Sequence, residues 1–476
     1  MIAQILSGEQ IERIHETSLA ILERVGVLVP HGEMLERFAA SGATVDRAAQ
    51  RVRIPPAMVL RAVEQAGKRF TIYGRDLARK AAFGQGARNY NSNAGEALWV
   101  DAPGEPRRYC TMADVATAAR FGDALDGIGI VGAMADPHET PVAYRCVAVM
   151  AELLRNTAKP ITFWFHDRAS ARFLVEVMIA VRGSQADAER YPLCYPLLEP
   201  ISPLRFPLHG IDLLFETARV NLPVHIGPMA QVGLSAPAAV AGTMAQENAE
   251  ILAGVCITQL VRPGMPVCYG GICHAFDMAT TQLIFAGPEQ AIFGVAMTQM
   301  GKRYGLPVYI NVGLTDAKRP DAQAGLEAGV TLALGAAAGA DIFGHMGISG
   351  VDQASSPAML LFQHEAIRYV ESVLRAIDFS DEALGLAEIE AAGPGGSFIE
   401  REHTARHFRR ELWFPRLLDR AYYEAWREAG ATSAEERCAE RAREIVRSHR
   451  HEPIDEDLSR ALDEIVGAAR ASLADD

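Results

Sequence analysis

Between residues 125 and 350, short apolar runs alternate with segments long enough to form helices. The runs lie at 127–134, 160–166, 193–199, 223–229, 266–272, 306–313 and 340–346, and a further β-like run at 281–286 would complete eight. This alternation is typical of parallel strands joined by crossover helices. The strand number, and the lack of a G-x-G-x-x-G sequence after a strand, favour an α/β fold of the (β/α)8 TIM-barrel type over a doubly wound dinucleotide-binding sheet.

Helical additions are expected on both sides of this barrel. Ser7 and Gln10 form a capping box at the start of an apolar helical face, and Gly26 ends that face. The polar stretch Tyr90 to Glu96 resembles a hairpin lid more than a core strand. After about residue 350 the chain becomes helical and charged. We therefore predict three parts: an N-terminal helical and hairpin accessory segment at 1–124, the barrel at 125–350 and a C-terminal helical segment at 351–476.

Composition narrows the class of protein. The chain has 476 residues, of which 49% are hydrophobic, and a formal net charge of -13 at pH 7, which argues against binding to nucleic acid phosphates. The start of the chain has no basic region followed by an apolar one, and the longest apolar stretch, 328–340, is too short to span a bilayer. Seven scattered cysteines indicate reduced thiols. A cytoplasmic protein without membrane association is expected.

The carboxyl ends of the predicted strands are rich in aromatic and polar residues. Barrel enzymes place their active sites at this end, so these residues are the first candidates for a site. They are Asp136, His138, Phe163, Trp164, Phe165, His166, Asp167, Tyr195, Glu199, His225, Tyr269, His274, Tyr309, Asn311, Phe343 and His345. Several rings at one mouth suggest a cage for a cation, and a quaternary ammonium ion is the natural guest. Glu199 follows an apolar run and could offset a cation or act as an acid or base.

Other chemistries find less support. The sequence contains no G-x-S-x-G nucleophile elbow and no H-E-x-x-H motif. Cys268, Cys273 and His274 form the only cysteine–histidine cluster, and this spacing alone is weak evidence for zinc. We expect no metal. A metal-dependent barrel hydrolase or lyase that uses these residues with His225 remains an alternative, as does a non-catalytic protein that binds betaines.

A set of motifs in chain order resembles the trimethylamine methyltransferase family. The motifs are Ser202-Pro203-Leu204, Gln246-Glu247-Asn248-Ala249-Glu250, Gln259, Arg262 to Val267, Gly287-Pro288-Glu289, Gly305-Leu306-Pro307, Thr315 to Lys318, Asp321 to Gly325 and Gly339-Ala340-Asp341. The flanks are similar too, at Ser7 to Gly26, Val52 to Pro56, Gly74-Arg75-Asp76 and His403 to Gly430. The match is collinear over nearly the whole chain, which makes it more specific than any one motif.

This resemblance implies a fold and a reaction. Members of the family are barrels that pass a methyl group from a methylated amine to cob(I)alamin, which a separate corrinoid protein carries, so no tightly bound cofactor is expected in this chain. The trimethylamine-specific members contain pyrrolysine, whereas this sequence has only the standard residues. The resemblance therefore points to a quaternary amine, glycine betaine or a related betaine, with trimethylamine as the alternative. A quaternary ammonium leaves as a neutral amine, so its methyl group needs no general acid.

Strand-end position suggests a role for each candidate. Trp164, Tyr269 and Tyr309 are expected to cage the ammonium group, and Glu199 to offset its charge as the candidate catalytic residue. His166, Asn311 and His345 are expected to bind a carboxylate or to orient the substrate. A barrel with exposed helical additions is also expected to form a homo-oligomer.

Overall fold

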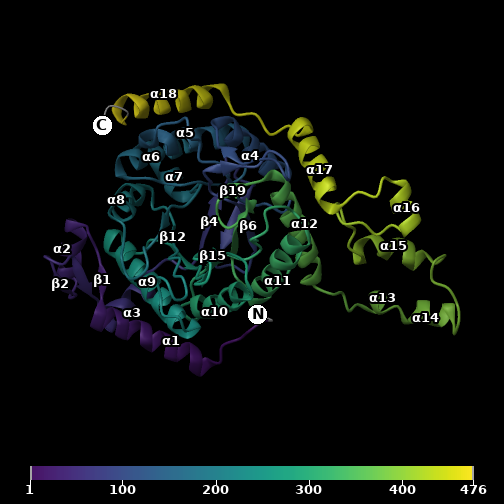
Figure 1. Ribbon diagram of the computed structural model, residues 1–476, viewed down its shortest axis with the longest axis horizontal. Helices are drawn as coiled ribbons and strands as arrows, with labels where there is room; N and C mark the ends of the chain where they lie inside the picture. The colour runs from purple at the N-terminus through teal and green to yellow at the C-terminus, as the bar shows by residue number, and fades with distance from the viewer. Residues whose placement is uncertain (1–2, 474–476) are drawn as a thin grey trace.

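The structure is a computed structural model that describes residues 3–473, and it is built from helices arranged around a core of parallel strands (Figure 1). Six strands form one parallel sheet in the order β11-β12-β13-β16-β17-β6. Their bounds are β6 Asn89–Ser92, β11 Leu197–Leu198, β12 Val224–Ile226, β13 Val267–Gly271, β16 Val308–Ile310 and β17 Ile342–Met346. This confirms a parallel α/β fold.

Two further parallel strands, β9 (Val131–Gly132) and β10 (Ile161–Thr162), pair with each other. On one side, the amide of Ser92 donates to the carbonyl of Ile130 at 3.2 Å, next to an isolated bridge between Asn91 and Ile130. On the other side, the amide of Ile161 donates to the carbonyl of Leu193 at 3.2 Å, in the segment that leads into β11. Hydrogen bonds therefore connect this pair to the edge strand β6 and to the segment that precedes the other edge strand, β11.

The structure corrects two predictions about strands. The run at 281–286 is not a parallel core strand, because β15 (Gln282–Ile284) pairs antiparallel with β14 (Ala275–Asp277) in a hairpin after β13. The stretch that begins at Tyr90 is not a hairpin lid, because β6 runs parallel to β17. The first residue of β6, Asn89, is hydrogen bonded inside the fold. Its side-chain amide donates to the carbonyls of Ala82 and Asp341, both at 2.8 Å.

A long helix follows each parallel strand before the next one. In chain order these helices are α4 (Met112–Ala124), α5 (Val142–Asn156), α6 (Arg168–Arg182), α8 (Leu208–Thr217), α9 (Val240–Val261), α10 (Pro288–Arg303), α11 (Ala322–Ala338) and α12 (Pro357–Val373). The short helix α7 (Gln185–Arg190) and the 3-10 turn η2 (Ala218–Val220) lie in the connections. Thr111 and Asp114 form a capping box at the start of α4, and Gly287 is the residue that precedes α10.

Four short strands cover the carboxyl ends of the neighbouring strands β6 and β17. The strands β7 (Leu98–Trp99), β8 (Arg108–Tyr109), β18 (Ile348–Ser349) and β19 (Ala354–Ser355) form one sheet in the order β18-β19-β7-β8. Within this sheet, β19 pairs parallel with β7, and the other two pairings are antiparallel. β7 and β8 lie between β6 and α4 in the chain, and β18 and β19 lie between β17 and α12.

The N-terminal segment packs on the outside of the helices and also reaches the strand interior. It contains α1 (Gly8–Ala20), the π-helical turn η1 (Ile21–Val25), β1 (Val27–Leu28), α2 (Gly32–Ala40), β2 (Thr44–Asp46), β3 (Arg51–Arg53) and α3 (Pro56–Gln65). The hairpin of β4 (Phe70–Tyr73) and β5 (Lys80–Phe83) then places Ile72 and Phe83 in one buried cluster with Tyr195, Tyr309 and Ile342 of the strand interior.

The C-terminal segment leaves the body as an arm and then returns. Residues 375–430 carry α13 (Asp381–Leu384), α14 (Leu386–Ala392), α15 (Glu402–Glu411) and α16 (Tyr423–Glu428), none of which buries a side chain. This arm projects from the body (Figure 1). The helices α17 (Ala434–Ser448) and α18 (Glu456–Leu473) pack back onto α12 and α4, and onto α5 and α6. Among the described residues, no helix is long and apolar enough to cross a membrane.

Candidate ligand-binding site at the carboxyl ends of the strands

Two aromatic rings from neighbouring parts of the sheet meet in the strand interior. The centroid of the His225 ring, on β12, lies 4.1 Å from that of Tyr309, on β16. Within residues 3–473, neither Nε2 of His225 nor Oη of Tyr309 has a hydrogen-bond partner, and both atoms are buried. Buried polar groups are nearly always paired with protein, water or ligand. These atoms therefore mark a place where a ligand or ordered water belongs.

Glycines on the adjacent strands make room for these rings. A Cβ atom on Gly344 would lie 1.7 Å from Oη of Tyr309, and one on Gly270 would lie 2.3 Å from Nε2 of His225. No other residue could stand at either position without displacing the ring. The rings of His225 and Tyr309 thus converge inside the curved sheet, over glycines of β13 and β17.

His345 and Trp164 extend the aromatic group toward the carboxyl ends. The His345 ring lies 5.9 Å from Tyr309 and 5.8 Å from Trp164, on which it stacks. His345 has a φ of 61°, and the pairing of β17 with β6 shifts register between Phe343 and Met346. Non-glycine residues held in this left-handed conformation are concentrated at functional sites. Trp164 is held by its Nε1, which donates to the carbonyl of Gly95 at 2.7 Å.

Both histidines of this group are neutral near pH 7. Burial lowers the pKa of His225 to about 3, with a further contribution from His345, and burial lowers the pKa of His345 to about 4. A neutral imidazole donates a hydrogen bond from one ring nitrogen and accepts one at the other. They can therefore orient a ligand at the mouth without adding positive charge to it.

Three carboxylates around the mouth have no ion-pair partner among the described residues. Glu199 directly follows β11, Glu96 follows β6, and Asp352 lies in the turn between β18 and β19. Within the described part of the chain, none of the three side chains forms an ion pair or accepts a hydrogen bond. The turn that carries Asp352 has three successive residues with positive φ, Gly350, Val351 and Asp352. A β-branched residue such as Val351 adopts this conformation only under strain.

The surroundings of these carboxylates raise their pKa values. Burial, followed by the charges of Asp352 and Asp136, raises the pKa of Glu96 to about 9. Burial and the charge of Asp352 raise the pKa of Glu199 to about 7, and burial raises the pKa of Asp352 to about 6. Glu199 is nevertheless exposed to solvent. Its carboxylate is therefore open to a ligand that arrives from solvent.

The structure brings together part of the predicted site. Trp164, Tyr309 and His345 form one aromatic group, and the charge of Glu199 acts on Tyr309. Asn311 is buried two residues beyond Tyr309, and its Oδ1 has no partner among the described residues. His166 follows Trp164 by two residues but contacts a helix instead of the aromatic group: its Nδ1 is 3.0 Å from the carbonyl of Val142 at the start of α5.

Tyr269 points away from the predicted mouth. Its ring is fully buried against the helices, next to Tyr304, and its Oη donates to Oδ1 of Asn248 on α9 at 2.8 Å. The reason is strand alternation, since Cys268 belongs to the interior cluster and the next residue must face the opposite side. We therefore leave Tyr269 out of the site.

Two residues of the mouth were missed in the sequence. Glu96 would have been found by the same strand-end rule, had the polar run at 89–92 been recognised as a parallel strand. Asp352 gives no such signal, because it lies in a hairpin turn that is inserted between β17 and α12.

The residues considered for a metal centre do not converge. His225 faces Tyr309 in the interior, Cys273 is hydrogen bonded to Glu247 of α9, and the ring of His274 stacks on Phe285 at 4.8 Å. Across residues 3–473, no group of three or more His, Cys, Asp or Glu could hold a metal ion.

Helix α9 fixes the loops around the mouth through its buried acidic residues. Glu247 accepts hydrogen bonds from the amides of Ala230, at 3.1 Å, and Ile272, at 2.6 Å, beyond the ends of β12 and β13. Glu250 accepts one from the amide of Leu204 at 2.7 Å, beyond the end of β11. The motif Gln246-Glu247-Asn248-Ala249-Glu250 is therefore a scaffold that positions three strand ends.

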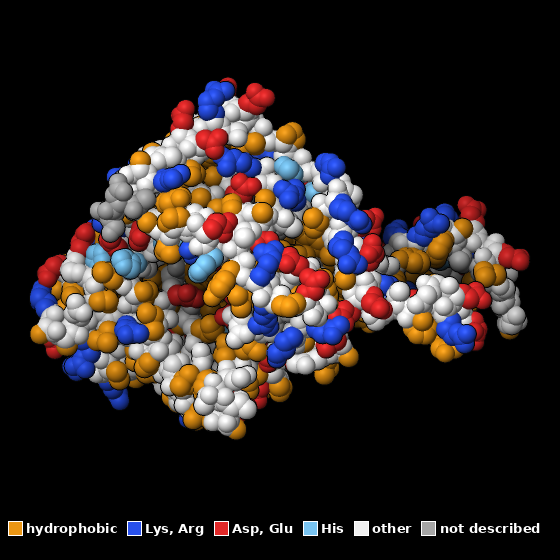
Figure 2. Space-filling view, turned by 45° about the horizontal axis from the view of Figure 1, so that its top comes forward, with side chains coloured by type: hydrophobic (Ala, Val, Ile, Leu, Met, Phe, Trp, Pro, Cys, Tyr) orange, Lys and Arg blue, Asp and Glu red, His pale blue; other side chains and the backbone are white. Residues whose placement is uncertain are grey.

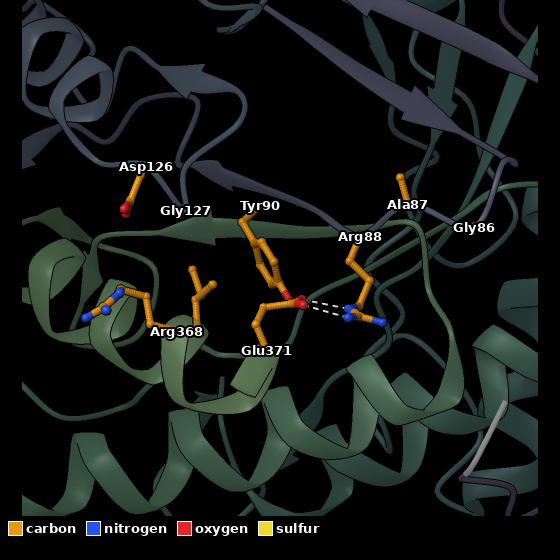
Figure 3. A pocket seen from close by; sticks show the side chains of 9 residues that line it. Gly86, Ala87, Arg88, Tyr90, Asp126, Gly127, Arg368 and Glu371 are labelled. Atoms are coloured by element: carbon orange, nitrogen blue, oxygen red, sulfur yellow. Dashed lines mark hydrogen bonds and ion pairs between the residues drawn. The ribbon is translucent and has the colours of Figure 1, made fainter. Parts of the chain in front are cut away.

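A cavity of about 600 Å³ lies at the opposite end of the strands (Figure 3). It opens between α12 and the segments that precede β6 and β9. Its charges are already paired: Arg88 donates to Glu371 at 2.6 and 2.5 Å, and Oη of Tyr90 also donates to Glu371, at 2.5 Å. The carboxylates of the mouth are unpaired, which makes the carboxyl ends of the strands the better candidate for a ligand site.

The fold and the mouth define a class: a parallel α/β protein that collects aromatic rings and unpaired carboxylates where its strands end. The family model described as "Trimethylamine methyltransferase (MTTB)" matches residues 1–474. The chain belongs to this trimethylamine methyltransferase family, which makes it a member of a methyltransferase family and confirms the resemblance seen in the sequence.

Individual relatives carry two different names. The chain is 29% identical to trimethylamine methyltransferase MttB of Desulfitobacterium hafniense (strain DSM 10664 / DCB-2), over 97% of this chain and 92% of that protein. It is 28% identical to the glycine betaine methyltransferase of Desulfitobacterium hafniense (strain Y51), over 89% of this chain and 88% of that protein. It is also 28% identical to trimethylamine methyltransferase MttB of Methanosarcina thermophila, over 95% of each chain.

A solved structure supports the fold. The crystal structure of the Methanosarcina barkeri monomethylamine methyltransferase (MtmB) matches with a TM-score of 0.51, over 94% of this chain and 92% of that one. The two sequences are only 10% identical, so this likeness concerns the fold alone.

Proposed function

We propose that this protein transfers a methyl group from a small quaternary ammonium compound to the cobalt of a cobalamin that a separate corrinoid protein carries. The observation that carries the proposal is the mouth itself, where the rings of Trp164, Tyr309 and His345 lie beside unpaired Glu199. Cations are attracted to aromatic faces and to carboxylates, and each good contact with a ring contributes about 0.5–2 kcal/mol.

We further propose that the parallel strands close into a complete (β/α)8 barrel. The six-stranded sheet and the β9–β10 pair would form one ring in the chain order β6, β9, β10, β11, β12, β13, β16, β17. The hydrogen bonds Ser92 to Ile130 and Ile161 to Leu193 support this closure. β6 lies within residues 1–124, so one strand of the ring comes from the segment assigned to the accessory part. The division at 125 and 350 stays a prediction, as does a cytoplasmic location.

Methyl transfer from a quaternary ammonium compound requires little acid–base chemistry from the protein. The carbon–nitrogen bond breaks with its electron pair remaining on nitrogen, and a neutral tertiary amine leaves. The methyl carbon would gain a bond to the reduced cobalt of the partner, which would supply the electron pair for that bond. Trp164 and Tyr309 would hold the ammonium group, neutral His345 and Asn311 would orient the rest of the molecule, and Glu199 would balance its charge. The contribution of this chain is thus positioning of the reacting methyl group.

The rim of the mouth offers a surface for a partner protein. Leu234, in the loop after β12, is 58% exposed, and Met278, in the turn of the β14–β15 hairpin, is 67% exposed. They lie near each other, since a Cβ atom on Gly233 would be 3.8 Å from the sulfur of Met278. Exposed apolar side chains beside a site are typical of protein contact surfaces, and we place the corrinoid protein there.

An anaerobic assay with titanium(III)-reduced cobalamin tests this function. Glycine betaine, carnitine, choline, proline betaine and trimethylamine are supplied in turn, and the cobalt absorption spectrum is followed. Conversion of cob(I)alamin to methylcobalamin with at least one quaternary compound is expected. Glycine betaine and trimethylamine represent the activities for which the relatives are named. Methylation by trimethylamine alone, or by none of the compounds, would contradict the proposal, and tight ligand binding without methylation would indicate a binding protein.

We also propose that copies of the chain associate through the arm and the face beside it. A groove of about 300 Å³ between α11 and α12 is lined mainly by apolar residues, including Phe362, Tyr369 and Val373. Leu418, at the root of the arm, lines the same groove. Apolar side chains are also visible along the arm (Figure 2), where Phe379 is 72% and Ile399 is 82% exposed. Because the apolar arm begins beside an apolar groove, a second copy can cover both by exchanging arms.

A further inference from the structure

The charges around the mouth influence which group the substrate can carry besides the methyl group that is transferred. Glu96, Glu199 and Asp352 approach it from three separate elements: the end of β6, the end of β11 and the β18–β19 turn. Their charges act on one another, since Asp352 influences both Glu96 and Glu199. A ligand that enters here therefore meets a surface of one sign.

Basic side chains around the mouth already have partners within the fold. Lys318, whose Cγ would lie 3.3 Å from a Cβ atom on Gly350, donates to the carbonyl of Asp316 at 2.8 Å. Arg145 forms an ion pair with Asp136 at 2.6 Å and donates to the carbonyl of Thr140. Arg107, which reaches the β18–β19 turn, donates to Gln353 at 2.7 Å and to the carbonyl of Ser349 at 3.3 Å. The three histidines nearest the interior, His225, His274 and His345, are kept neutral because burial lowers their pKa values. A carboxylate on the ligand would thus find no cationic partner among these groups.

Two buried polar atoms without partners support a ligand at the acidic cluster. Oη of Tyr309, on a side chain that is only 1% exposed, lacks a partner within the described residues, and the charges of both Asp352 and Glu199 act on this tyrosine. Asn311, 4% exposed, presents an unpartnered Oδ1 two residues further along the same chain segment. Tyr309 can donate one hydrogen bond, and the Asn311 oxygen can accept one. A hydroxyl group on the ligand could satisfy both.

Resting on the proposed methyl-transfer function, we propose that this mouth selects quaternary ammonium compounds that carry no carboxylate, with a hydroxyl group or alkyl chain in its place, over zwitterionic betaines. Choline represents the favoured class, and glycine betaine the disfavoured one. The two molecules share the trimethylammonium group and differ mainly in replacing a hydroxymethyl by a carboxylate. The aromatic group holds the part that they share, and the three carboxylates discriminate between the parts that differ.

Measurements of ligand binding in the absence of the corrinoid partner test this inference, because no methyl transfer can then take place. Isothermal titration calorimetry of the full chain compares choline, glycine betaine and 3,3-dimethyl-1-butanol, a neutral molecule with the shape of choline. We expect choline to bind about tenfold more tightly than either of the others, or more. Glycine betaine binding as tightly as choline, or the neutral alcohol doing so, would overturn the inference.

Variants locate the discrimination. Glu199→Gln and Asp352→Asn are each expected to narrow the preference for choline over glycine betaine by about threefold or more. Asp101→Asn is the matched control, because Asp101 follows β7 of the same covering sheet but is paired with Arg108 at 2.7 Å. It should leave the preference unchanged. Thermal unfolding of each variant separates lost binding from lost folding, and the comparison of ligands on the unmodified chain needs no variant at all.

The binding and transfer experiments can fail separately. Tighter binding of choline without methylation of cob(I)alamin by any compound would leave the selectivity in place and contradict the proposed function. Methylation by glycine betaine with binding at least as tight as that of choline would support the function and overturn the selectivity.

Discussion

The ring of His225 lies 4.1 Å from the ring of Tyr309, and both present a buried polar atom with no partner in the described chain. The two residues come from β12 and β16, which are separated in the sheet by β13, where Gly270 leaves space for the imidazole. Such a pair is costly in an empty protein, because an unsatisfied buried polar group costs about 1–3 kcal/mol. A ligand that bonds to both atoms recovers this free energy.

Replacing Tyr309 by Phe tests whether its hydroxyl contacts the ligand. The variant keeps the ring that faces the ammonium group and removes only Oη. We expect roughly fivefold weaker binding of choline, which corresponds to about 1 kcal/mol, with unchanged or slightly raised thermal stability because an unsatisfied group is lost. Calorimetric titration and a melting curve provide the two measurements. Unchanged affinity would remove the hydroxyl from the site.

Tyr269→Phe is the opposite case. Its hydroxyl donates to Asn248 on the outer side of the sheet, so its loss should leave a buried acceptor unsatisfied and lower the free energy of unfolding by about 1–3 kcal/mol. Ligand affinity should not change. Urea unfolding and titration with choline measure these quantities. Weaker binding at undiminished stability would return Tyr269 to the mouth.

Binding of a cation is expected to strengthen as the pH rises. The pKa values of Asp352, Glu199 and Glu96 are raised to about 6, 7 and 9, so the ligand-free mouth holds protons that its ionised form lacks. A cation favours the ionised form, so its binding releases protons and its affinity increases from about pH 6 to about pH 9. The other charged neighbours, Asp136 and Arg145, are paired with each other.

Titrations in buffers of different ionisation enthalpy measure this proton release. Glu199→Gln should remove the part of the dependence centred near pH 7. The same raised pKa values contribute stability to the ligand-free protein at low pH, which is lost as pH rises through them. Affinity that falls with rising pH would mean that protonated carboxyl groups bind the ligand, and would contradict a cation-binding mouth.

The proposed self-association is tested at the exposed face of α11. Leu326 and Val330 are 68% and 48% exposed and lie one turn apart. Changing both to Asp should convert an oligomer to a monomer in sedimentation velocity, because burying two charges in an apolar contact is costly. Leu60→Asp on α3, 46% exposed in the monomer, is the control and should leave the oligomer intact. A monomer in the unmodified protein would end this proposal.

The sequence anticipated the fold wherever apolar residues mark a strand. Seven apolar runs correspond to β9, β10, β11, β12, β13, β16 and β17. The remaining strand was missed because β6 is polar: Asn89 is accommodated inside the fold by two side-chain hydrogen bonds, which an apolar pattern cannot reveal. An antiparallel hairpin at 275–284 imitated the missing strand, since a short β-like run does not disclose its direction.

For the candidate site, position at a strand end indicated which rings lie close together, but it did not indicate which way a side chain faces. Trp164, Tyr309 and His345 were found by position, and the structure brings their rings together. Tyr269 shares that position, but alternation along β13 turns it outward. His345 would also face outward in a regular strand, and its positive φ accompanies the register shift in β17. Such local departures depend on neighbouring strands that a single chain pattern does not show.

A crystal structure with choline tests the central claim most directly. The account predicts that the ammonium nitrogen lies within about 6 Å of the ring centroids of Trp164 or Tyr309, with the carboxylate of Glu199 beside it and one methyl group directed out of the mouth. Choline found instead in the cavity beside Arg88 and Glu371, or a mouth that stays free of it at saturating concentration, would contradict the account.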